Sequence, residues 1–89
     1  MTAITLRKQL DELTISSMQA TIAMHQFGWL EAVEAYINAP TTDPVARLAY
    51  QRATHFKRTS PTLLAVASAV GIPSADLDQM FVFGRGVEV

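Results

Sequence analysis

Cysteine is missing from this chain of 89 residues, so disulfide bonds and thiolate metal sites are excluded. No apolar run approaches the roughly 18 residues that a membrane-spanning helix needs. The first residues, MTAITLRKQLDEL, lack the apolar centre of a signal peptide. We therefore expect a soluble domain that stays inside the cell and has no contact with a membrane.

Signatures of catalysis are missing as well. His25 and His55 lie 30 positions apart, and neither has a carboxylate at the spacing of a metal site. No serine is set in a nucleophile elbow, and the Gly84-Arg85-Gly86 stretch is too short for a phosphate-binding loop. The sequence therefore predicts no enzyme activity, no catalytic residue, no metal and no cofactor.

Hydrophobic residues are plentiful, at 49% of the chain against 17% charged residues. They recur at helical spacing in residues 4–13, about 16–26, 29–39, 44–57, 61–70 and 74–81. The pattern predicts an all-α fold, a compact bundle of five or six short helices that forms one domain over residues 1–89. A composition this apolar also favours a patch that is left free for a partner.

The core is expected to form around Trp29, the one tryptophan, together with Phe56, Leu64 and Phe81. The inward face of the helix over 44–57 is predicted to consist of Val45, Leu48, Ala49, Ala53 and Phe56. Its basic residues, Arg47, Arg52 and Lys57, are expected to point toward solvent.

Residues 60–81 carry the clearest local signals, for two short helices joined by a tight turn. Ser60 and Pro61 suit the start of the first helix. Gly71 suits its left-handed end, and Pro73 prevents its continuation. Ser74 is expected to cap the second helix. The arrangement resembles a helix-turn-helix, in which small and apolar residues let two helices cross closely.

Two interpretations of this helix pair stay open, a structural pair and a DNA reader. The second helix would be the reading helix, and it carries Asp76 and Asp78 without any Lys or Arg. Carboxylates repel phosphates, whose neutralisation supplies much of the affinity for DNA. The structural pair is therefore favoured, and we expect no sequence-specific binding to DNA.

Charge is unevenly placed along the chain. Residues 44–73 carry a balance of +4, between residues 1–43 with −3 and residues 74–89 with −2. The basic cluster, and with it the first set of candidate partner contacts, consists of Arg47, Arg52, His55, Lys57 and Arg58. It could bind an acidic protein surface or nucleic acid. The favoured alternative is a solvated face that pairs inside the molecule with Glu31, Glu34, Asp76 or Asp78.

Residues 82–89 depart from helical spacing. Gly84 and Gly86 favour an extended or turned path over a helix, and the apolar residues are too many for a solvated end. This tail either folds back over its own core or docks on a partner or a second copy of the chain, and docking is favoured. Its candidate contacts are Phe83, Arg85, Val87 and Val89.

Residues 29–81 resemble small, mostly uncharacterised proteins encoded by tailed bacteriophages and prophages. The resemblance rests on residues 48–61, LAYQRATHFKRTSP, on the turn Val70-Gly71-Ile72, and on residues 77–81, LDQMF. Trp29 ahead of Tyr36 also fits the pattern. Residues 82–89 depart from it, because an alanine-rich ending is more usual.

Genes for such proteins lie in late, structural regions of phage genomes, often near tail genes. The resemblance implies a non-enzymatic protein that binds other proteins in tail structure or assembly, in the bacterial host cytoplasm or in the virion. Two other functions stay open, a helix-turn-helix regulator that binds DNA and a small phage inhibitor of a host protein. The expected partner is a phage structural protein, a host protein or a second copy of the chain.

Overall fold

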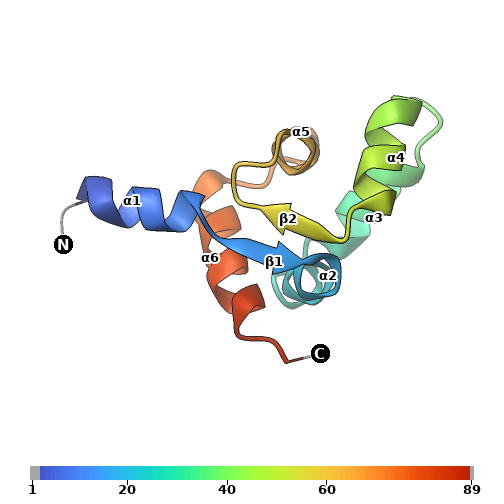
Figure 1. The fold of residues 1–89 in the computed structure, drawn as a ribbon. Coiled ribbons are helices and arrows are strands. Elements are labelled where there is room, and N and C mark those ends of the chain that lie inside the picture. The colour runs from blue at the N-terminus through green and yellow to red at the C-terminus, as the bar shows by residue number, and fades with distance from the viewer. Residues whose placement is uncertain (1–2, 89) are drawn as a thin grey trace.

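The computed structural model describes residues 3–88, and Figure 1 shows how this part of the chain folds. Its elements are α1 (Ala3–Asp11), β1 (Thr14–Ser16), α2 (Ser17–Gln26), α3 (Leu30–Asn38), α4 (Pro44–Arg52), β2 (His55–Lys57), α5 (Pro61–Val70) and α6 (Ser74–Arg85). The prediction of a mainly helical chain is confirmed. The structure adds a two-stranded sheet that the prediction did not contain.

The sheet joins two segments that lie far apart in the sequence. β1 and β2 run antiparallel, with Ile15 opposite Phe56, and both of these side chains are buried. Hydrogen bonds extend the pairing at both ends, from Ser17 N–H to the Thr54 carbonyl at 2.8 Å and from Arg58 N–H to the Leu13 carbonyl at 2.9 Å. The helix predicted over 44–57 therefore ends at Arg52, because the residues that follow pair with β1 instead.

Local capping signals set the ends of α2 and α5. The Ser16 hydroxyl accepts a hydrogen bond from Gln19 N–H, and the Gln19 side chain accepts one from Ser16 N–H, which forms a capping box. In α5 the Ser60 hydroxyl accepts from the N–H of Leu63, and Gly71 ends the helix in the left-handed region at φ 84°. The predicted start and end of α5 are therefore confirmed.

The start of α6 differs from the prediction that Ser74 caps it. Pro73 is the N-cap residue and makes no side-chain cap, while Ser74 is the first helical residue. The Ser74 hydroxyl accepts a hydrogen bond from Arg58 Nη2 at 2.9 Å. The side chain is thus engaged by Arg58 rather than by the first turn of its own helix.

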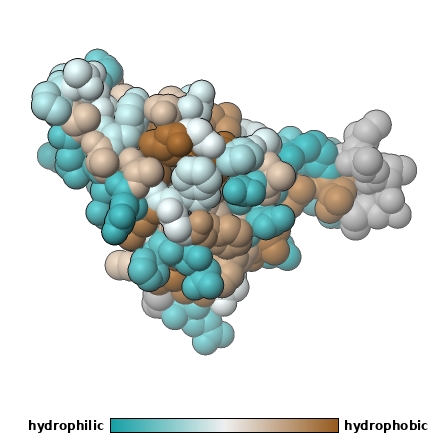
Figure 2. All heavy atoms as spheres, turned by 180° about the vertical axis from the view of Figure 1, so that it is seen from behind, coloured by the Kyte–Doolittle hydropathy of each residue, from teal (hydrophilic) through white to brown (hydrophobic). Residues whose placement is uncertain are grey.

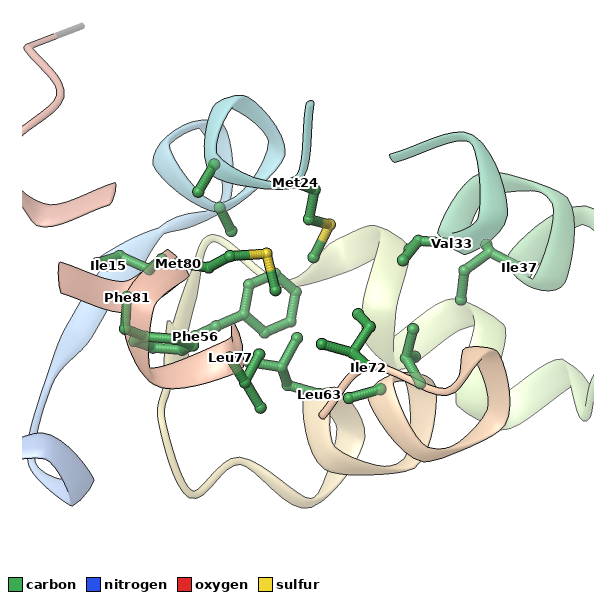
Figure 3. Packing of buried hydrophobic residues seen from close by; sticks show 14 residues of the cluster. Ile15, Met24, Val33, Ile37, Phe56, Leu63, Ile72, Leu77, Met80 and Phe81 are labelled. Atoms are coloured by element: carbon green, nitrogen blue, oxygen red, sulfur yellow. The ribbon is translucent and has the colours of Figure 1, made fainter. Parts of the chain in front are cut away.

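The core lies where α2, α3, α5, α6 and the sheet meet (Figure 3). Its buried hydrophobic residues are Ile15, Ala20, Ala23, Met24, Val33, Ile37, Phe56, Leu63, Val66, Ala67, Ile72, Leu77, Met80 and Phe81. α6 packs chiefly against α2, and α5 packs chiefly against α3. The two helices of the predicted pair therefore pack more closely on other helices than on each other.

Phe56 and Phe81 are buried in this core as predicted, but Trp29 and Leu64 are placed differently. Trp29 is the N-cap residue of α3 and is half-buried at the edge of the core. Leu64 is exposed because its neighbour Leu63 takes the inward position of that turn of α5.

The predicted inward face of α4 is also wrong in part. Val45 is 72% exposed and Leu48 is 51% exposed, and none of the residues of α4 is buried. The helix spans nine residues and meets only the neighbouring α3 and α5 to an appreciable extent. The spacing of the apolar residues in α4 therefore does not predict which face of this helix packs against the core.

The prediction of an extended tail over residues 82–89 is wrong for its first half, because α6 continues to Arg85. Gly84 is buried inside the helix, and a Cβ at this position would lie 3.1 Å from Ile15 Cδ1 and 3.4 Å from the Gln19 carbonyl. Here glycine lets α6 approach β1 and α2 closely. The free energy gained from this packing outweighs the cost of about 1 kcal/mol that glycine carries inside a helix. Val89 lies outside the described residues.

The replacement Gly84→Leu should lower the free energy of unfolding by about 2 kcal/mol. Overpacking costs up to about 3 kcal/mol, and the better helix propensity of leucine offsets about 1 kcal/mol of that cost. Urea unfolding followed by circular dichroism measures the change. The matched control is Gly86→Leu, because a Cβ at Gly86 meets only the Phe83 carbonyl at an ordinary 3.5 Å. Equal losses in the two variants would contradict the close approach at Gly84.

Candidate functional site

Two adjoining hollows lie between α1 and α6, and we call them together the α1/α6 groove. The larger has a volume of about 460 Å³ and is lined by Leu6, Leu10, Asp78, Gln79, Val82 and Phe83. The smaller has a volume of about 140 Å³ and is lined by Leu6, Gln9, Leu10, Leu13, Val82 and Arg85. Leu6, Leu10 and Val82 are shared, so the hollows form one continuous surface.

Apolar side chains dominate the groove and stay accessible to solvent. Leu6 is 50% exposed, Val82 44% and Phe83 39%. Figure 2 shows hydrophobic surface where the body of the molecule meets the projecting helix α1. Contiguous apolar surface of this kind on a small domain is typical of a site for another macromolecule.

The ring of Phe83 is held in place by a second aromatic ring. It meets Phe27, which follows α2, in an edge-to-face contact with ring centroids 5.9 Å apart and an interplanar angle of 74°. A fixed aromatic ring contributes contact area without losing much conformational entropy when a partner binds.

Asp78 connects the two walls of the groove. Arg7 of α1 donates from Nη1 and Nη2 to the two carboxylate oxygens of Asp78 at 2.8 and 2.9 Å. Arg58 donates from Nε to Asp78 Oδ1 at 2.8 Å, and its own side chain is only 7% exposed. One carboxylate of α6 therefore holds both α1 and the turn after β2.

The two arginines also set the titration of this carboxylate. The hydrogen bonds from Arg7, and then the one from Arg58, hold the pKa of Asp78 below its ordinary value of 3.8, although partial burial acts in the opposite direction. The same pairing raises the pKa of Arg7. Both groups are therefore charged throughout the neutral range.

The groove is lined by apolar side chains together with a few polar ones. Asp78 is neutralised by its arginines, and Arg85 stands at the rim of the smaller hollow. Within residues 3–88, no three His, Cys, Asp or Glu side chains are grouped so that they could hold a metal ion. The polar members of the lining are Gln9, Asp78, Gln79 and Arg85.

The basic cluster predicted from the sequence is divided by the fold. Arg58 is buried and pairs with Asp78, as the alternative of internal pairing predicted. Arg47, predicted to face solvent, is half-buried and donates to the carbonyls of Ile37 at 2.7 Å and Ala39 at 2.6 Å. It therefore satisfies carbonyls at the end of α3.

The other members of the cluster lie on the surface. Arg52, His55 and Lys57 are exposed at the end of α4 and along β2. In the part of the chain that the structure describes, none of the three forms an ion pair. They remain candidate contacts, but they are not part of the α1/α6 groove.

The candidate contacts of the predicted tail are divided in the same way. Phe83 and Arg85 belong to the groove. Val87 is half-buried, and its carbonyl accepts a hydrogen bond from Gln19 Nε2 at 3.0 Å, so this residue folds back beside α2. Val89 is again outside the described residues.

Sequence reasoning did not assign Leu6, Leu10 and Gln79 to a site, and it placed Val82 in the docking tail without naming it as a contact. The leucine stripe of α1 is visible in the sequence, and it could have marked one wall of a groove. Its other wall depends on the contact between Arg7 and Asp78, which lie 71 positions apart. No local pattern signals a contact over that distance.

Comparisons with protein-family models, with curated proteins and with solved structures find no match. The resemblance to phage proteins therefore stays a prediction from the residues quoted for it. None of the helices in the described part of the chain is both long enough and apolar enough to cross a membrane.

The replacement Asp78→Asn should cost about 3 kcal/mol of unfolding free energy at neutral pH, because it leaves the buried guanidinium of Arg58 without a counter-charge. The loss should also depend on pH. The pKa of Asp78 is lowered in the folded state, so its stabilisation is complete above pH 3.8 and disappears as the pH falls through the folded-state pKa. Urea unfolding between pH 7 and about pH 2 should therefore show the two curves converging at the acid end.

The control for this comparison is Asp76→Asn. Asp76 lies in the first turn of α6 and forms no ion pair within the described residues, so its loss should cost less than about 1 kcal/mol. If the unfolding free energies of Asp78→Asn and of the unaltered chain instead differ by the same amount at every pH, that result would contradict the role of the charged Asp78 carboxylate as the partner of Arg7 and Arg58.

Proposed function

We propose that this chain acts by binding another protein through the α1/α6 groove and has no enzyme activity. The observation that carries the proposal is the continuous apolar surface of Leu6, Leu10, Val82 and Phe83 between two helices. Protein interfaces commonly consist of a buried apolar centre that is surrounded by polar groups. Gln9, Gln79 and Arg85 form such polar surroundings here.

The biological setting that we propose is the tail structure or tail assembly of a bacteriophage or prophage, either in the host cytoplasm or in the virion. This part of the proposal rests on the resemblance of residues 29–81. A small phage protein that inhibits a host protein would use the same groove, and the identity of the bound protein distinguishes the two cases.

A DNA-binding regulator has less support. The charge of Asp78 in α6 is matched by two arginines, but Asp76 places an unmatched carboxylate in the first turn of the same helix, within the described residues. The one basic residue of α6, Arg85, lies in its last turn. The exposed basic residues Arg52, His55 and Lys57 belong to other elements.

The proposal is tested with a photo-crosslinking residue placed at Val82, in the groove, and at Val45 as a matched exposed control on α4. Each variant is expressed in the organism that carries the gene, and adducts are identified by mass spectrometry after irradiation. We expect protein adducts at position 82 that are absent at position 45. Equal or absent adducts at the two positions would contradict a binding function for this groove.

A further inference from the structure

We infer that the occupant of the α1/α6 groove is helix α1 of a second copy of this chain, and that the two copies pair antiparallel about a two-fold axis. The inference rests on the proposed function, since it names the partner for the same groove. Its evidence is the isolation of α1, the pattern of residues along α1, and the position of α6 beside it.

Helix α1 is too short to be stable without packing. It has nine residues, and helices below about 12–15 residues are marginal in water unless an apolar face is covered. Among the helices of the described part, α1 alone makes no extensive contact with another element. It projects at one end of a molecule that measures 45 × 26 × 21 Å (Figure 1). One apolar face of α1 therefore lacks cover within a single copy.

The apolar face of α1 complements itself. Leu6 and Leu10 lie one turn apart on α1, Leu13 follows two residues after the end of the helix, and all three line the groove. When two such helices run antiparallel, Leu6 of one copy lies beside Leu13 of the other. The two copies of Leu10 then meet at the axis. A two-fold interface uses the same patch on both chains, as this pattern requires.

The helix dipoles favour the same direction. In an antiparallel pair the amino end of each helix lies beside the carboxyl end of the other, whereas a parallel pair aligns the two dipoles unfavourably. The charged residues of this segment do not decide the direction, because they lie away from the leucines and Arg7 already pairs with Asp11 and Asp78 within one copy.

A stable interface needs a larger area than α1 alone provides, so we expect it to include α6 as well. Specific interfaces bury about 800 Å² on each partner, which is more than one face of a nine-residue helix can supply. Val82 and Phe83 adjoin the leucines of α1 and extend the apolar surface onto α6. The second α1 is therefore expected to lie in the angle between α1 and α6, so that each copy covers both walls of the other.

The absence of cysteine makes the arrangement directly testable. We expect Leu10→Cys to form a disulfide-linked dimer on mild oxidation at least ten times faster than Val45→Cys, the exposed control on α4. In the antiparallel pair the two copies of position 6 are separated by roughly 10 Å along the helices, at a rise of 1.5 Å per residue. Leu6→Cys should therefore not cross-link, because disulfides need Cα atoms within about 7 Å. Rapid cross-linking of both groove variants would mean a parallel pair and overturn the inference.

Sedimentation equilibrium on the unaltered chain separates this inference from the proposed function. We expect a monomer–dimer equilibrium whose dissociation constant rises at least tenfold in Leu6→Asp and stays unchanged in Val45→Asp. A chain that stays monomeric at millimolar concentration would overturn the pairing. If adducts with a different protein still formed at position 82, the proposed function would stand with another occupant. If neither adducts nor dimers formed, both proposals would fail.

Discussion

The shared carboxylate of Asp78 is the interaction on which the placement of the groove depends. Arg7 reaches it from α1, and the buried Arg58 reaches it from the turn between β2 and α5. A buried guanidinium is expensive unless its charge is matched, so Arg58 requires a carboxylate at this position. Arg7 then shares the same group from the solvent side. The pair therefore anchors a helix that the apolar core itself does not reach.

The second constraint is the close approach of α6 to α2 and β1. Small residues make it possible, with Gly84 on α6 facing Ala23 on α2 and Ile15 on β1. This contact fixes the line that α6 follows, and it turns Val82 and Phe83 toward α1 while Phe81 stays inside. The outer face of α6 becomes a wall of the groove because its inner face is packed so tightly.

The features that the sequence predicted well are the ones encoded within a few residues. Ser60, Pro61 and Gly71 specify α5 through hydrogen bonds and backbone angles inside or beside the helix. The strands were not predictable in this way, since three residues are too few to display an alternating pattern. Gly84 was misleading for a related reason. It is unfavourable for a helix by itself, and the neighbour that requires it, Ile15, lies 69 positions away. The groove was only half predictable. The leucines of its first wall are visible along α1, but the position of its second wall depends on contacts between residues far apart in the sequence.

The pairing of β1 with β2 also bears on the order in which the chain folds. Ile15 and Phe56 are partners across 41 positions, with α2, α3 and α4 between them. Closing so long a loop costs conformational entropy, and helix formation within it shortens the distance that must be closed. Helices form in about a microsecond, but α2, α3 and α4 have only nine or ten residues and are marginal until they pack. We therefore expect the sheet to form late, in the step in which these helices pack and complete the core.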